Sequence, residues 1–240
     1  MLGSEDSPGI LPCAVRDIFN GIRKEKDTFE YTIHVSYLEI YNENIHDLFC
    51  RDRSQQNDLK FINDPHHGVA VQGLMRQQVK TFEQAMILMH FGEEQRVYKE
   101  TNIHDHSSRS HTIFRIQIQK KPLNKSGGLK IIYSTLNLVD LAGSERLNEF
   151  DTKSDIQGET QYINKSLFTL SLVINKLAES KSSHIPYRDS KLTRILQHAL
   201  GGNSKTAIIC TISPASINFY QTLSTLRFAS RASAIKNVPM

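Results

Sequence analysis

The sequence predicts an α/β domain in which strands and helices alternate through one core. Three segments carry this prediction. Residues 29–37 alternate between apolar and polar side chains, residues 159–179 repeat apolar side chains at helical spacing, and residues 206–213 form an apolar, β-branched run. A chain of 240 residues with 39% hydrophobic residues can bury a large core, so we expect one large domain.

The first part of the chain contains one clear strand and two helical patterns. The segment FEYTIHVSY at 29–37 places every second residue, all apolar or aromatic, on one face, which is typical of a half-buried strand. Apolar residues of 39–49 then recur at helical spacing and predict a helix, and those of 82–91 predict another. The polar segment 51–57 is typical of a loop.

Two strands follow in the middle of the chain. Residues 111–119 (HTIFRIQIQ) and 129–140 both have the composition of strands, and the turn-like segment KPLNKSGG at 121–128 joins them. We therefore expect these two strands to pair with each other.

Helices dominate the last part of the chain. In 159–179, Ile163, Leu167, Leu170 and Ile174 repeat at spacings of four, three and four, which predicts a long amphipathic helix. A shorter helix is expected at 190–200, closed by two glycines. The run TAIICTIS then predicts a buried strand, and residues 220–234 predict a last helix.

Composition narrows the class of protein. No run reaches the length of a membrane-spanning helix, and the first residues lack the basic and apolar regions of a secretory signal, so we expect an intracellular, soluble protein without a membrane partner. Three scattered cysteines without metal-ligand spacing are expected to be buried thiols in a reducing compartment. The net charge of +4 favours an acidic partner. A nucleic-acid partner is disfavoured, because no aromatic-basic surface or nucleic-acid module is present.

The segment NLVDLAGSER at 137–146 is the first candidate for chemistry. A strand that ends in Asp140, with Gly143 three residues later, is the arrangement by which phosphate-hydrolysing proteins hold a magnesium-bound water and contact a terminal phosphate. An ordinary turn at a strand end has the same pattern, so this DxxG needs a companion.

A companion lies in NIHDHSSRSH at 102–111. Its Ser107 and Ser108 hydroxyls could serve a metal ion and the attacking water, and Arg109 could pair with a carboxylate. A polar loop is the alternative. A metal site made by the three histidines of this segment is disfavoured, because no cysteine lies near and no companion ligand cluster exists.

A third segment, HIPYRDSKLTR at 184–194, is basic. Arg188, Lys191 and Arg194 follow one another at spacings of three, so they share one face of a short helix or of the loop before it. This is either a solvated basic face or the contact surface for an acidic polymer.

Seven ordered segments resemble the kinesin motor domain across nearly the whole chain. They are VSYLEIYNENIHDLF, NIHDHSSRSH, NLVDLAGSER, INKSL, HIPYRDSKLTRIL, GGNSKTAIICTISP and TLRFASRA. The sequence around SKLTRILQHALGGNSKTAIICTISPA is most similar to the centromere-associated branch, kinesin-7. The resemblance implies a P-loop NTPase fold, with a central mixed sheet that contains parallel strands and has helices on both faces.

The resemblance also implies an ATP-driven motor that moves along microtubules and uses ATP and Mg²⁺. It places Asn102 with the nucleotide-binding residues, Ser108 on the metal, Ser107 near the attacking water and Asp140 on the metal through water. It gives the backbone N–H of Gly143 to the γ-phosphate. It pairs Arg109 with Glu145 as the salt bridge between the two nucleotide switches.

A microtubule contact is implied for the long helix and for the basic segment after it. By resemblance the residues that face tubulin are Asn164, Lys165, Tyr187, Arg188, Lys191 and Arg194. The implied location is the cytoplasm and its microtubules, including the spindle. Residues 1–235 would be a partial motor domain, residues 236–240 the start of the neck linker, and dimerisation would use regions outside this chain.

The chain departs from the family pattern at two places. None of its 12 glycines begins a GxxxxGK(S/T) phosphate-binding loop, and Met1–Gly3 with Pro8–Pro12 resembles the segment that follows that loop in the family. We therefore expect a fold that is incomplete at its N-terminus and exposes apolar surface. Acidic residues in 147–155 are expected to weaken a contact with acidic tubulin. The alternative function is a non-catalytic, kinesin-like module that binds microtubules.

Overall fold

A computed structural model describes residues 1–4, 6–51, 59–64, 68–97, 109–123, 130–143, 154–179 and 184–239, with only the backbone described for residues 97 and 154–164. The chain divides into two compact units. Unit 1 contains Met1–Tyr41 and Ile45–Ala142, and unit 2 contains Asn42–Asn44 and Gly143–Met240. Each unit is described by itself.

Unit 1 is built on an antiparallel sheet with the strand order β2-β1-β6-β7, to which β5 adds by pairing with β1. The strands are β1 (Phe29–Tyr41), β2 (Asn44–Asp47), β5 (Gln77–Val79), β6 (His111–Pro122) and β7 (Ile132–Asp140). In the register of the central strands, Val35 lies opposite Ile116, and Ile116 lies opposite Leu136. The predicted pairing of the strands at 111–119 and 129–140 is confirmed.

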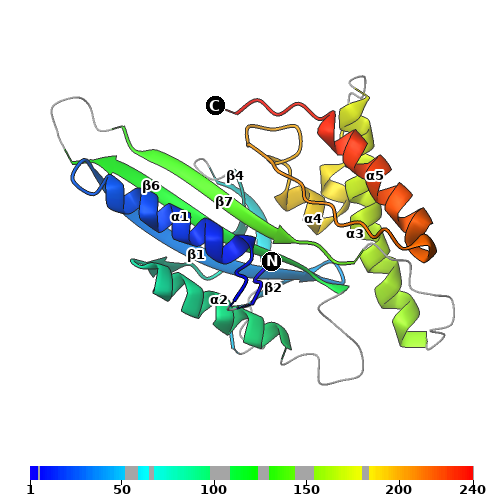
Figure 1. Ribbon diagram of the computed structural model, residues 1–240, viewed down its shortest axis with the longest axis horizontal. Helices are drawn as coiled ribbons and strands as arrows, with labels where there is room; N and C mark the ends of the chain where they lie inside the picture. The colour runs from blue at the N-terminus through cyan, green and yellow to red at the C-terminus, as the bar shows by residue number, and fades with distance from the viewer. Residues whose placement is uncertain are drawn as a thin grey trace. The chain divides into compact units, whose positions relative to one another are not determined.

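Helices α1 (Ile10–Lys24) and α2 (Phe82–Val97) pack on one face of this sheet (Figure 1). The alternation of β1 explains why, since Ile33, Val35 and Tyr37 point to that face and are almost completely buried. The core residues shared by the strands and the two helices are Leu11, Val15, Ile33, Val35, Tyr37, Val79, Ala85, Met89, Phe114, Ile116 and Leu138.

The opposite face of the sheet carries the hairpin of β3 (Lys60–Asp64) and β4 (Gly68–Gln72). Arg115 points to this face, because its neighbours on β6 point into the helical core. It is buried, donates from Nε to Asn137 Oδ1 over 2.7 Å and from Nη1 to the carbonyl of Val69 over 3.2 Å. Burial, with the nearby Arg76 as a smaller cause, lowers the pKa of Arg115 to about 10. The guanidinium thus ties the hairpin to the sheet.

Unit 2 is helical in its described part. It contains α3 (Ser154–Ala178), the 3-10 turns η3 (Tyr187–Asp189) and η4 (Ser216–Asn218), α4 (Lys191–Ile195) and α5 (Phe219–Ser233). Both α4 and α5 pack against α3. Leu170 and Ile174, which the helical spacing predicts to be buried, are buried in α3, and Leu167 is half-buried. Ser166, Thr169 and Val173 are also buried, although the spacing does not predict them.

Two of the predicted helices and strands are wrong. Residues 39–49 do not form a helix: β1 continues to Tyr41, and β2 begins at Asn44. The two residues between them, Asn42 and Glu43, have φ of 52° and 55°, as a tight hairpin turn with a left-handed backbone requires. The apolar positions of this segment were too few to separate a helix from two strands around a turn.

The second wrong prediction concerns residues 206–213. This run forms no strand, and Ile208, Ile209 and Ile212 are 45%, 69% and 56% exposed. A strand that is apolar on both faces is stabilised only when it is paired and covered on both sides. No described residue pairs with it in a ladder, so it remains extended and open, as expected for a fold that exposes apolar surface.

The cysteines also differ from the prediction of buried thiols. All three are free; Cys13 is exposed, and Cys50 and Cys210 are half-buried. In the described part of the chain, no helix combines the length and the apolar character that crossing a membrane requires.

Candidate functional site

The two sequence motifs meet where β6 begins and β7 ends. The last ladder pair between these strands joins Thr112 to Asp140, so the Ser-rich motif and the DxxG motif leave the sheet at the same edge. Asp140 is half-buried there, and Arg109, just before β6, is 9% exposed. The sequence predicted both motifs, and the ladder brings their ends together.

A hydrogen bond links the two motifs directly. The backbone N–H of Ala142 donates to Nδ1 of His111 over 2.9 Å, and both residues are buried. An imidazole nitrogen that accepts a hydrogen bond carries no proton, so His111 is neutral here and its proton is on Nε2. Burial, with a smaller contribution from the Arg96 guanidinium, lowers the pKa of His111 to about 4, which agrees with this state.

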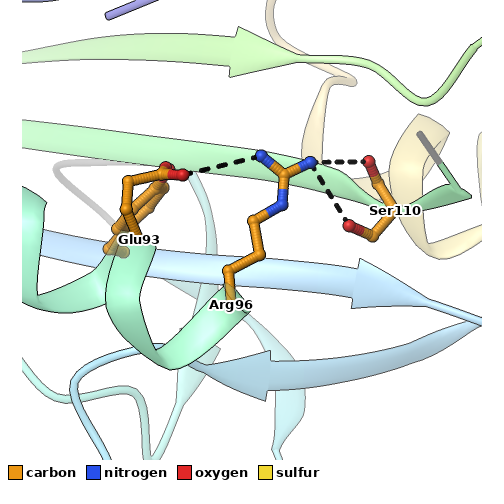
Figure 2. Close-up of polar contacts among 4 residues, drawn as sticks. Glu93, Arg96 and Ser110 are labelled. Carbon is orange, nitrogen blue, oxygen red and sulfur yellow. Dashed lines mark hydrogen bonds and ion pairs between the residues drawn. The ribbon is translucent and has the colours of Figure 1, made fainter. Parts of the chain in front are cut away.

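A chain of polar side chains leads from the sheet core to the same place, and Figure 2 shows its end. The hydroxyl of Tyr37 donates to Glu93 Oε1, and Glu93 Oε2 lies 3.8 Å from Arg96 Nη1. Arg96 Nη2 lies 3.4 Å from the hydroxyl and 3.5 Å from the carbonyl oxygen of Ser110. The C-terminal end of α2 is thereby attached to the residue that follows Arg109.

Most residues of this polar chain are shielded from solvent. Tyr37, Arg96 and Ser110 are buried, and burial, reinforced by the Glu93 carboxylate, raises the pKa of Tyr37 above its ordinary value. The tyrosine therefore remains a neutral donor at every physiological pH.

A small pocket of about 190 Å³ opens beside Asp140. Its polar lining groups are Tyr37, Glu93, Thr112 and Asp140. Its apolar wall is formed by Leu11, Phe114 and Leu138, and the segment Met1–Gly3 completes it. Among the described residues, no group of three or more His, Cys, Asp or Glu side chains could hold a metal ion by itself.

The predicted basic residues lie in unit 2, on three consecutive elements. Lys165 is on α3 and is exposed, Arg188 is on η3 and is exposed, and Lys191 and Arg194 are on α4 and are half-buried. The Arg194 guanidinium donates to Gln197 Oε1 over 2.8 Å, one turn further along. These cations are held by contacting elements of one unit, since α3, η3 and α4 pack together.

Local contacts explain why η3 and α4 take this form. Ser190 is the N-cap of α4 and accepts the N–H of Thr193 over 3.1 Å, while the Thr193 hydroxyl donates to the carbonyl of Tyr187 over 2.9 Å. The Tyr187 hydroxyl donates to the carbonyl of Leu200 over 2.5 Å, and burial raises its pKa. Tyr187 thus supports the basic segment from inside unit 2, a role that the sequence did not suggest.

Asn237 fastens the C-terminal segment to the loop after α4. Its Oδ1 accepts the N–H of Gly201 over 2.7 Å, and its Nδ2 lies 3.0 Å from Ala199 O, 2.8 Å from Ser204 O and 3.1 Å from Thr206 Oγ1. This segment is the one that resembles the start of a neck linker.

Several predicted site residues lie outside the described residues: Asn102, Ser107, Ser108 and Glu145, together with the acidic segment 147–153. Asn164 lies on α3, but its side chain is not described. Sequence reasoning missed Tyr37, Glu93 and Arg96, whose roles depend on which residues the sheet and α2 bring together. The sequence suggests His111 only as a metal ligand. In the structure its Nδ1 accepts a hydrogen bond from the backbone N–H of Ala142.

Comparison with known proteins identifies the family. A profile described as the kinesin motor domain matches residues 1–235. The chain is 49% identical to Kinesin-related protein 4 of Dictyostelium discoideum over 98% of its length, and 47% identical to Centromere-associated protein E of Homo sapiens over its full length. It spans only 12% and 9%, respectively, of those two proteins.

Solved structures agree with this result. A structure of a fast kinesin, studied for its ATPase mechanism and its interactions with microtubules, has a TM-score of 0.89 at 43% identity. A two-heads-bound KIF14 dimer in complex with a microtubule and AMP-PNP has a TM-score of 0.88 at 38% identity. This chain is covered completely in both comparisons and covers 66% and 68% of those chains. The α/β fold class is confirmed, and the chain belongs to the kinesin family, within its motor domain.

Proposed function

We propose that this chain is the part of a kinesin motor that reads the terminal phosphate of ATP and holds the microtubule, in a protein that couples ATP hydrolysis to movement along microtubules. The observation that carries this proposal is the junction of the two motifs at Thr112 and Asp140. Two loops that leave one sheet edge together can respond to one phosphate group.

The two motifs are proposed to supply the metal side and the γ-phosphate side of a nucleotide site. Asp140 and Thr112 supply oxygen atoms at the pocket, and Gly143 follows β7 closely enough for its N–H to serve a phosphate. Ser107 and Ser108 are assigned to the attacking water and to Mg²⁺, and Asn102 to the nucleotide. Bound ATP and Mg²⁺ would supply the phosphoryl group and the charge neutralisation for its transfer to water.

The chain's own residues are proposed to transmit the state of the site. Arg109 and Glu145 close as an ion pair between the two loops when the terminal phosphate is present, and the pair opens when it is lost. Because Gly143 and Glu145 precede α3 in the chain, this opening is proposed to shift α3 between two positions. The result is a microtubule contact that depends on nucleotide.

The microtubule face is proposed to consist of Asn164, Lys165, Arg188, Lys191 and Arg194, supported by Tyr187. The support for this proposal is that α3, η3 and α4 contact one another and present their cations from one unit. Attraction between such cations and an acidic partner weakens as salt rises. The acidic segment 147–155 is proposed to reduce this attraction. The proposed location is the microtubule cytoskeleton of the cytoplasm, including the spindle.

The test is co-sedimentation with microtubules of the full polypeptide that contains these residues, with AMP-PNP and with ADP. Binding should be tighter with AMP-PNP, and Arg188→Ala with Lys191→Ala should weaken it roughly tenfold, since each surface charge pair contributes up to about 1 kcal/mol. The matched control is Lys24→Ala with Lys26→Ala, two exposed cations of unit 1, which should leave binding unchanged. Equal binding by both double variants would contradict the assigned face.

A second candidate function rests on one sequence observation. No GxxxxGK(S/T) loop occurs in the 240 residues, so a phosphate cradle would have to come from other parts of the polypeptide. A non-catalytic microtubule-binding module would bind with the same sensitivity to salt and to Arg188→Ala, but equally well with AMP-PNP and ADP. The same co-sedimentation experiment therefore separates the two functions.

A further inference from the structure

The β6–β7 ladder ends before Ser110 and Ala142, the next two residues that could face each other as a pair of the same kind. Its last pair joins Thr112 and Asp140, and the same register continued by two residues would set Ser110 opposite Ala142. Both of these residues are buried, so their backbone polar groups need partners other than water.

Side chains provide these partners. The N–H of Ala142 donates to His111 Nδ1 over 2.9 Å, and the carbonyl of Ser110 accepts from Arg96 Nη2 over 3.5 Å (Figure 2 shows the contact of Arg96 with Ser110). A hydrogen bond from the N–H of Ala142 to the carbonyl of Ser110 is one of the two that a further ladder pair would make. Both of these backbone groups have side-chain partners in its place.

The stronger of the two contacts is the one to His111. Its length is ideal for a hydrogen bond, whereas the contact of Arg96 with the Ser110 carbonyl is at the outer limit. The imidazole has a fixed position, because the His111 backbone is paired in β6 opposite Ile40 and the residue is only 2% exposed. It can therefore fix the position of a backbone group that lies outside the sheet.

We propose that His111 is a positioning residue that fixes the backbone between Asp140 and Gly143 by holding the N–H of Ala142. This inference rests on the proposed function, in which Asp140 serves the metal and Gly143 the terminal phosphate. Ala142, one of the two residues between them, is held through its N–H by a side chain and not by the backbone of a neighbouring strand. The position of the backbone after Asp140 is thereby fixed without a further pair in the β6–β7 ladder.

The experiment measures amide hydrogen exchange of the 240-residue chain by NMR, without nucleotide. In His111→Ala the Ala142 amide should exchange at least tenfold faster, while the amides of Leu38 and Ile116 in the central strands change less than twofold. His111→Asn should restore slow exchange at Ala142, because its side-chain oxygen can occupy the place of Nδ1. His111→Gln, whose amide reaches one bond further, should not.

Two results would overturn the proposal: unchanged exchange at Ala142 in His111→Ala, or an equal acceleration at Ala142, Leu38 and Ile116, which would indicate general destabilisation. A measurement on the unaltered chain remains decisive if His111→Ala does not fold. The ¹⁵N spectrum of the imidazole should show an unprotonated Nδ1 near neutral pH, and a proton on Nδ1 would refute the hydrogen bond. None of these readouts involves ATP or microtubules, so their failure is distinct from failure of the proposed function.

Discussion

The ring of Tyr37 lies directly against the backbone of Gly92, in the space that a side chain at residue 92 would need. A Cβ atom on Gly92 would lie 2.3 Å from Cδ1 and 3.0 Å from Cε1 of that ring. The ring is 3% exposed and packs edge-to-face on Phe114, so it has no room to withdraw. Glycine at this position is what allows α2 to approach β1 so closely.

Gly92→Ala should therefore destabilise unit 1. Alanine gains about 1 kcal/mol over glycine inside a helix, but overpacking a buried ring costs about 1–3 kcal/mol, so we expect a net loss of roughly 1 kcal/mol. Urea unfolding measures the change. The control is Gly21→Ala in α1, where an added Cβ meets nothing within 4 Å, and which should stabilise the chain. An increase in stability for both variants would contradict the assigned packing.

The neutral state of His111 predicts a dependence of stability on acid. Its pKa is lowered in the folded chain from 6.5 to about 4, so the unfolded chain binds more protons between these two values. The contribution is fully present above pH 6.5 and is lost as pH falls toward 4, with a total of roughly 3 kcal/mol.

Chemical unfolding at a series of pH values measures this effect as the difference between the unaltered chain and His111→Asn. Carboxylates titrate in the same range and affect both proteins equally, so they cancel in the difference. The free energy of unfolding of His111→Asn should fall less steeply between pH 6.5 and 4. Parallel curves for the two proteins would show that folding does not lower the pKa of His111.

The Asp47 carboxylate joins two segments of unit 1 by hydrogen bonds to their backbone. Its Oδ2 accepts the N–H of Met75 over 2.7 Å and its Oδ1 accepts the N–H of Phe49 over 2.9 Å. Burial raises its pKa, although both hydrogen bonds oppose that shift. Asp47→Asn should lower the free energy of unfolding by about 1–3 kcal/mol, because the amide NH₂ would face a backbone donor. Asp27→Asn, in an exposed turn, serves as the control and should be neutral in the same denaturant titration.

Asn237 predicts a local effect in unit 2. Its side chain holds residues 199–206 through one acceptor and two donor hydrogens. Asn237→Ala should accelerate amide exchange in 201–206 roughly tenfold and leave α1 unaffected. Asn237→Asp keeps the acceptor for Gly201 but loses both donors, so only the Gly201 amide should stay protected. Uniform acceleration across the chain would assign Asn237 a global role.

The sequence predicted elements whose stability is local and missed those whose form depends on distant partners. The alternation in 29–37 identified β1 and its core face because the side-chain period of a strand is independent of its neighbours. Helix α1 was missed, although Leu11, Val15, Ile18 and Ile22 repeat at spacings of four, three and four. That spacing predicts an amphipathic helix.

The residues of the candidate site likewise include some that the sequence predicts and some that it misses. Asp140 and Arg109 stand out by their motifs, and the structure places them at one sheet edge. The contact of His111 with Ala142 depends on a ladder register that joins residues about thirty positions apart, which no local pattern specifies. Arg96 looks like an ordinary cation in the last turn of a helix, and its burial comes from packing of α2 on the sheet. The predicted strand at 206–213 failed because pairing, and not composition, makes a strand.

The exposed isoleucines of 206–213 have a consequence for the life of the protein in a cell. An extended backbone that presents Ile208, Ile209 and Ile212 is the kind of surface that chaperones hold and proteases recognise.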